Sequence, residues 1–122
     1  MGKPLTQQEL HNLAMNTVGR QLEEEDFDFM GVNSKLKKNP QFVCLKEKKL
    51  HFIIVRNATF PNNPKDYDVA FMKKMKDHAD KHEARTYYAG VGLSNAADPR
   101  QPVYLNEPYI VDYDGLIEIK DE

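Results

Sequence analysis

Two histidines and two pairs of carboxylates are the residues of this chain whose spacing suits catalysis or metal binding. His78 and His82 stand four residues apart, which places both imidazoles on one helix face, as in many zinc sites. The segments Asp26–Asp28 and Asp112–Asp114 each carry acids at i and i+2, so each pair shares one face of a strand. The histidines lack a third ligand, and the acids lack a His or Lys companion. We therefore predict no catalytic residue and no metal ligand.

The most strongly charged segment of the chain is basic. Residues 35–56 hold seven Lys or Arg against one acid, for a local charge of +6, whereas residues 98–122 carry a local charge of −5. A basic segment of this kind suits a phosphate backbone, so nucleic-acid binding through residues 35–56 is one alternative function. Since the net charge of the chain is only −2, a solvated basic face is the favoured interpretation.

Two helices are predicted from hydrophobic periodicity and capping signals. Thr6 and Glu9 form a capping box in front of a helix over residues 7–24. A second amphipathic helix is predicted over residues 65–83, with Asn63 as its N-cap and Pro64 as its first residue.

Strands account for most of the remaining apolar residues. Residues 27–33 alternate in polarity, and 42–45 and 52–55 are apolar runs predicted to form a buried hairpin. A further strand is predicted over residues 86–93, where Gly90 and Gly92 indicate that another segment packs closely against the backbone. Short strands are also predicted at three sites near the end of the sequence, 103–105, 109–111 and 116–119.

The resulting order defines the fold class as α+β, with one domain over residues 1–122. The core is an α-β-β-β-α-β arrangement around a mixed central sheet, followed by a β-rich tail. The one cysteine, Cys44, excludes a disulfide framework and a four-cysteine cluster, and we predict that it is an inert buried thiol. No cofactor is predicted. The longest apolar run has four residues, so we expect no membrane segment and a cytoplasmic protein.

The same order resembles the core of the restriction-endonuclease-like superfamily, the PD-(D/E)-x-K nucleases. In that family, the resemblance implies an Asp on the second strand and an (Asp/Glu)-x-Lys on the third that hold a divalent cation. The Asp position falls at about Phe42, beside Gln41, and the other two positions fall on Ile54 and Arg56. The resemblance covers roughly residues 6–93. Because both carboxylates are replaced, it implies a nuclease-like fold without nuclease activity.

The segments at residues 37–43 and 88–93 also resemble those of short bacterial proteins that carry the label of a sodium-translocating NADH:quinone reductase component. That label implies a ferredoxin-type cluster and a membrane anchor. One cysteine and no apolar segment of about 20 residues supply neither.

The leading hypothesis is a non-catalytic interaction or accessory domain on a degenerate nuclease-like fold. Its partner is an unknown protein or a second copy of the chain, bound through the C-terminal strands, and an enzyme with relocated ligands is the least favoured alternative. The candidate ligand- or partner-binding residues combine the basic segment, the motif positions and an aromatic pair: Lys37, Lys38, Gln41, Arg56, Tyr87 and Tyr88.

Overall fold

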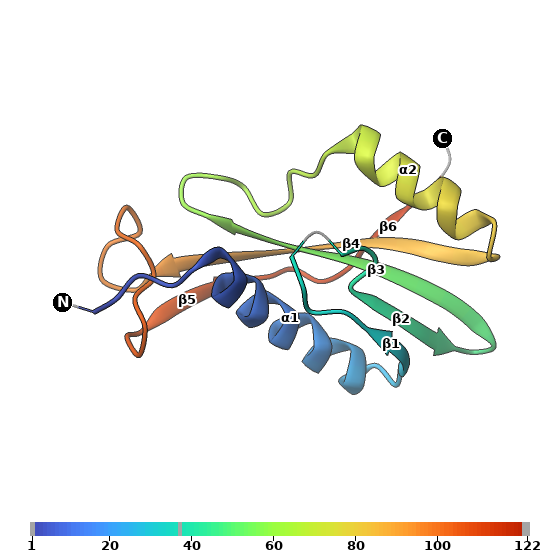
Figure 1. The fold of residues 1–122 in the computed structure, drawn as a ribbon, viewed down its shortest axis with the longest axis horizontal. Helices are drawn as coiled ribbons and strands as arrows, with labels where there is room; N and C mark the ends of the chain where they lie inside the picture. The colour runs from blue at the N-terminus through green and yellow to red at the C-terminus, as the bar shows by residue number, and fades with distance from the viewer. Residues whose placement is uncertain (1, 37, 121–122) are drawn as a thin grey trace.

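The computed structural model describes residues 2–36 and 38–120, which form two helices and one six-stranded sheet (Figure 1). The elements are α1 (Gln7–Glu24), β1 (Asp28–Val32), β2 (Phe42–Lys46), β3 (Lys49–Thr59), α2 (Val69–Asp80), β4 (Ala84–Asn95), β5 (Tyr109–Asp112) and β6 (Ile117–Ile119). The strand order is β1-β2-β3-β4-β5, and β6 also pairs with β4. Since β3 and β4 are parallel and the other pairs antiparallel, the predicted α+β class with a mixed sheet is confirmed.

Helix α1 spans the residues predicted for it because its first turn is fully capped. The Thr6 hydroxyl accepts from the Glu9 amide at 3.1 Å, and the Glu9 carboxylate accepts from the Thr6 amide at 2.9 Å. These hydrogen bonds hold the pKa of the Glu9 carboxyl below its usual value. The helix ends before Asp26, whose positive φ of 62° turns the chain toward β1.

Strands β2 and β3 form the predicted hairpin. Glu47 and Lys48 connect them with φ values of 51° and 66°, the backbone of a two-residue hairpin turn. The pairing ends where Phe42 lies opposite Ile53, so β3 continues for six residues beyond its partner. Strand β1 forms the outer edge, and its register shifts between Phe29 and Gly31.

Helix α2 begins later than predicted. The sequence placed its N-cap at Asn63, but Asp68 caps it, with its carboxylate accepting from the Phe71 amide at 3.0 Å. Asn63 instead accepts from the Lys65 amide at 2.9 Å and forms a local turn. The predicted first four helical residues therefore belong to a loop, and this loop builds one wall of the cavity described below.

Two short strands, β5 and β6, lie along the outer edge of β4 and pair with its two ends. The strand predicted at residues 103–105 does not form. Tyr104 makes only an isolated bridge with Pro4, supported by hydrogen bonds from Leu5 to Val103 and from Leu105 to Lys3. The N-terminal segment thus occupies this stretch in place of a sheet partner.

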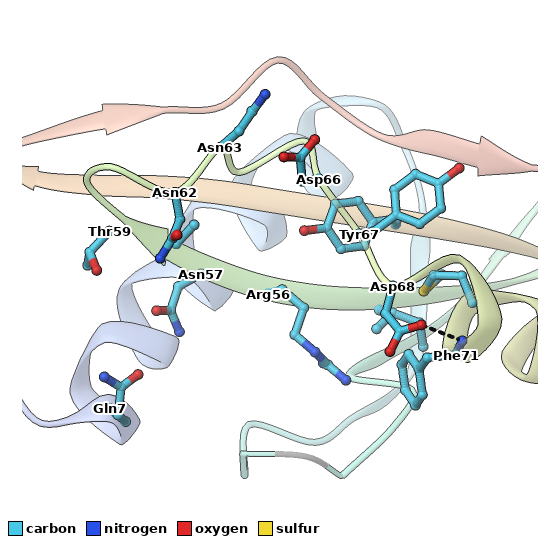
Figure 2. Close-up of a pocket in the computed structure, with 14 residues that line it drawn as sticks. Gln7, Arg56, Asn57, Thr59, Asn62, Asn63, Asp66, Tyr67, Asp68 and Phe71 are labelled. Atoms are coloured by element: carbon cyan, nitrogen blue, oxygen red, sulfur yellow. Dashed lines mark hydrogen bonds between the residues drawn. The ribbon is translucent and has the colours of Figure 1, made fainter.

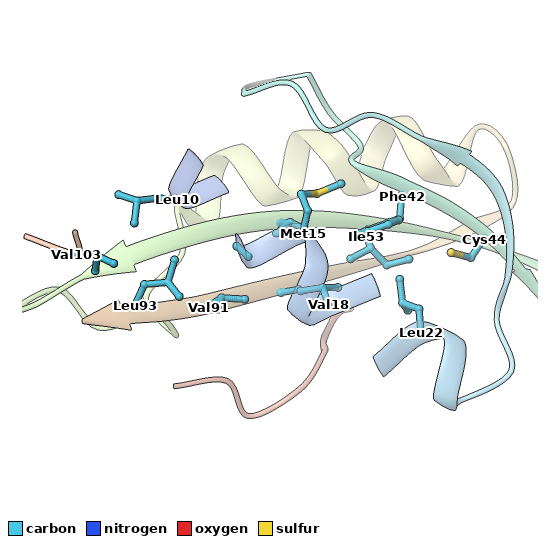
Figure 3. Close-up of a cluster of buried hydrophobic side chains, with 13 residues drawn as sticks. Leu10, Met15, Val18, Leu22, Phe42, Cys44, Ile53, Val91, Leu93 and Val103 are labelled. Carbon is cyan, nitrogen blue, oxygen red and sulfur yellow. The ribbon is translucent and has the colours of Figure 1, made fainter. Parts of the chain in front are cut away.

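The two faces of the sheet are covered unequally. The face under α1 carries a continuous core of 13 buried residues (Figure 3), namely Leu10, Ala14, Met15, Val18, Leu22, Phe42, Cys44, Ile53, Val55, Ala89, Val91, Leu93 and Val103. The face under α2 carries two separate clusters of three buried residues each, around Phe52 and around Ile54. The shorter helix α2 therefore leaves part of its face uncovered.

Cys44 lies within the α1-face core, as predicted. Its side chain is fully buried, and burial raises the pKa of the thiol to about 11. Such a thiol is inert at neutral pH. Neither helix of the described residues combines the length and the apolar character that crossing a membrane requires.

Candidate functional site

A cavity of about 530 Å³ lies beside the part of β3 that extends beyond β2 (Figure 2). Its floor is β3 from Ile54 to Thr59, and its walls are the 62–68 loop, the first turn of α2 and Tyr88 of β4. Gln7, at the start of α1, lies at its rim. Elements that are distant in sequence therefore meet around one hollow of the size that small ligands occupy.

Two glycines of β4 hold the 62–68 loop in place. A Cβ at Gly90 would overlap the carbonyl oxygen of Pro64, and one at Gly92 would lie 3.1 Å from the Pro64 ring. The Tyr88 hydroxyl donates to the same carbonyl oxygen at 2.8 Å. The prediction that a segment packs closely against Gly90 and Gly92 is thus confirmed, and that segment is the cavity wall.

Arg56 is the one Lys or Arg among the described residues that line the cavity. Its guanidinium donates to the carbonyl of Val55 at 2.8 Å and to Asn39 Oδ1 at 2.9 Å, and lies 5.2 Å from the centre of the Phe71 ring. No carboxylate of residues 2–36 and 38–120 forms an ion pair with it. Partial burial lowers the pKa of Arg56. A guanidinium has five N–H donors, so Arg56 retains donors and an uncompensated charge for an incoming anion.

Gln41 is completely buried next to this site and positions Arg56 indirectly. Its side-chain carbonyl accepts from the Val55 amide at 2.7 Å, and its amide donates to Asn39 Oδ1 at 2.9 Å and to the Lys38 carbonyl at 3.1 Å. Asn39 thus joins Gln41 to Arg56. The structure brings these two candidate residues into one network, although Gln41 does not line the cavity.

The two candidate tyrosines lie on opposite faces of β4. Tyr88 is buried and lines the cavity, with its ring centre 5.0 Å from that of Tyr67. Tyr87 packs against the α1-face core, with its ring centre 5.6 Å from that of His51. Burial raises the pKa of both phenols. Only Tyr88 therefore belongs to the site.

The basic segment 35–56 is divided between two ends of the sheet. Lys48 and Lys49 lie at the hairpin tip, whereas Lys38 and Arg56 lie at the opposite end of the β2–β3 pair. Lys38 is exposed and contributes its carbonyl, not its ammonium, to the network around Gln41. Lys37 lies outside the described residues. These described cations therefore do not form one continuous phosphate-binding surface.

The residue pairs suited to metal chemistry also lie apart. The His78 and His82 rings are 5.1 Å apart, and both pack against Phe52 on the exposed side of α2. Asp114 forms an ion pair with Lys65. Across residues 2–36 and 38–120, no three metal-ligating side chains come together.

Several cavity residues were missed by the sequence analysis. Tyr67, Asp66 and Asp68 lie in the segment predicted to be helical, where their place in the cavity was not apparent. The useful signal was the tight sequence of Asn62, Asn63 and Pro64, whose turn chemistry delays the helix and places the loop over β4.

Fold and site together define a small α+β protein with a polar cavity beside an unpaired strand segment. The chain matches the family model described as Domain of unknown function (DUF8840) over residues 8–119, and it belongs to that family. No solved structure and no curated protein sequence matches it.

Proposed function

We propose that this chain is a non-catalytic binding domain on a degenerate nuclease-like scaffold, and that its ligand site is the cavity beside Arg56. The positions where the nuclease resemblance implies metal-binding carboxylates carry Phe42, beside Gln41, and Ile54. Phe42 and Ile54 are buried and apolar, and Gln41 is engaged in internal hydrogen bonds. What remains at that site is a cation without its usual acidic partners, which suits binding and not hydrolysis.

The observation that carries this proposal is the environment of Arg56. A partly buried guanidinium loses hydration, and its neighbours Val55 and Asn39 offer only neutral oxygen atoms. A carboxylate or another oxyanion entering the cavity restores the lost charge balance through charge-assisted hydrogen bonds. Phe71 and Tyr67 supply ring surface for the apolar part of such a ligand.

A titration followed by NMR tests this function. Sodium acetate is added to the ¹⁵N-labelled protein against sodium chloride at equal ionic strength, and the amide signals of Asn57 and Phe71 are followed. We expect saturable shifts in the wild type, and at least about tenfold weaker binding in Arg56→Gln. Arg20→Gln, the same charge change on the exposed side of α1, is the matched control and binds as the wild type does. Equal acetate affinity in Arg56→Gln would refute the proposal.

A second function, self-association, is favoured by the edge strand β5. Tyr109, Ile110 and Val111 are exposed by 41%, 53% and 43%, and β5 carries no Lys, Pro or bulge that would prevent strand addition. Antiparallel pairing of β5 with its copy gives a closed twofold dimer. Sedimentation velocity over a series of concentrations tests this: Ile110→Lys abolishes the dimer, and Val32→Lys on the opposite edge does not. A strict monomer at every concentration contradicts it.

A further inference from the structure

The cavity borders a stretch of β3 whose backbone lacks a partner on one side. In the β2–β3 register, Ile53 and Val55 turn their backbone groups toward β2, since the Ile53 carbonyl accepts from Gln41 and the Val55 amide donates to the Gln41 side chain. Strand alternation turns Asn57 and Thr59 the same way. Within the described residues, no group pairs there with either backbone unit of Asn57 or with the Thr59 amide.

This open edge is closed at one end. The Val55 carbonyl is occupied by Arg56, and Gln41 and Asn39 fill the line that a neighbouring strand would follow further along β3. An added strand must therefore stop beside the guanidinium. A peptide N-terminus carries a positive charge and is repelled at that point, whereas a C-terminal carboxylate is attracted.

The charge on the other side of the cavity limits the ligand further. Asp66 and Asp68 lie in the loop wall, and Asp68 already caps α2. A polyanion such as a nucleic acid or a polyphosphate meets these acids across the cavity, while a single carboxylate needs only Arg56. The site thus fits a ligand with one negative charge and an extended polar backbone.

We propose that the cavity binds the C-terminal segment of a partner polypeptide as a short added strand. This inference rests on the proposed function of Arg56. The segment runs antiparallel to β3, exchanges backbone hydrogen bonds with Asn57 and places its terminal carboxylate on Arg56. Its side chains on the cavity side lie against Tyr67 and Phe71.

Amide hydrogen exchange at Asn57 tests the added strand. The probe is a mixture of N-acetylated hexapeptides of random sequence that end in a free carboxylate, and the control is the same mixture amidated at its C-terminus. In the free protein, the Asn57 amide exchanges faster than that of Ala58, which faces β4. The free-acid mixture slows exchange at Asn57 in proportion to the fraction of protein bound, and amidation weakens binding at least about tenfold.

An acetate arm separates this inference from the function on which it rests. If acetate binds in an Arg56-dependent manner while the free-acid peptides leave Asn57 exchange unchanged, the added strand is wrong and the anion site stands. If neither acetate nor peptide binds, both proposals fail. Equal binding of the amidated and free-acid mixtures, or undiminished peptide binding by Arg56→Gln, also overturns the assignment of the carboxylate to Arg56.

Discussion

The two faces of the sheet differ in what their side chains do. Under α1, an 18-residue helix covers three strands with one continuous apolar core, and this face is closed. Under α2, a 12-residue helix starts only after a seven-residue loop wall, 62–68, and leaves a polar cavity beside Arg56. The first face accounts for stability, and the second carries the groups that are available for binding.

The difference begins with local sequence. A capping box starts α1 within six residues of the N-terminus, so every turn of that helix contributes to the core. Turn-forming residues delay α2 until Asp68, and the glycines of β4 accept the resulting loop. Cavity and core therefore follow from where each helix is allowed to begin.

The largest expected effect is the loss of a core side chain on the α1 face. Leu22 is completely buried, so Leu22→Ala should lower the free energy of unfolding by about 3 kcal/mol. Phe71→Ala, at the half-buried rim of the cavity, should cost only about 1 kcal/mol. Urea unfolding measures both, and equal losses would remove the distinction between the faces.

Gly90→Ala should produce the next largest effect, about 2 kcal/mol, because the added Cβ displaces Pro64 and with it the cavity wall. Gly31→Ala is the matched control, since a Cβ there lies 3.9 Å from that of Val43, an ordinary contact. Urea unfolding and acetate titration are both informative for Gly90→Ala. Unchanged stability and unchanged binding would show that the loop does not depend on Gly90.

Acid pH should destabilise the α1 face. Burial holds the pKa of His11 and of His51 below the usual 6.5, and His11 Nε2 and His51 Nδ1 have no hydrogen-bond partner in the described chain. The unfolded chain therefore binds protons first, and stability that is complete above about pH 6.5 falls at lower pH. Each histidine contributes a slope of up to about 1.4 kcal/mol per pH unit. Urea unfolding at several pH values should show a shallower slope for His11→Gln, and an identical slope would contradict this.

The smallest effect on stability is expected from Arg56→Gln. The guanidinium carries a desolvation cost that no described carboxylate offsets, so its removal should change the free energy of unfolding by less than about 1 kcal/mol. Urea unfolding without ligand measures the change. A loss above about 2 kcal/mol would indicate that Arg56 is a structural cation that holds the loop at Asn39.

Much of the fold was predictable from sequence because it rests on local signals. The capping box at Thr6, the apolar runs of β2 and β3 and the glycines of β4 each identified their structure correctly. The start of α2 was predicted wrongly because Asn63 and Asp68 are both competent caps, and packing of Pro64 on β4 decides between them.

The site was only partly accessible to the same reasoning. Arg56 and Tyr88 were identified, but Tyr87 lies on the other face because adjacent residues of a strand alternate. Asn39, which joins Gln41 to Arg56, and the open edge at Asn57 depend on the β2–β3 register, which periodicity alone does not fix.

The most direct test of a binding site on the α2 face is the side-chain Nε–Hε spectrum of the four arginines during acetate titration. Arg20, Arg85 and Arg100 are exposed and serve as internal controls for Arg56 in the same sample. We predict that the Arg56 signal shifts most and saturates, while the other three respond only to ionic strength. An Arg56 signal that stays unchanged, or shifts no more than that of Arg20, would contradict a binding site on this face.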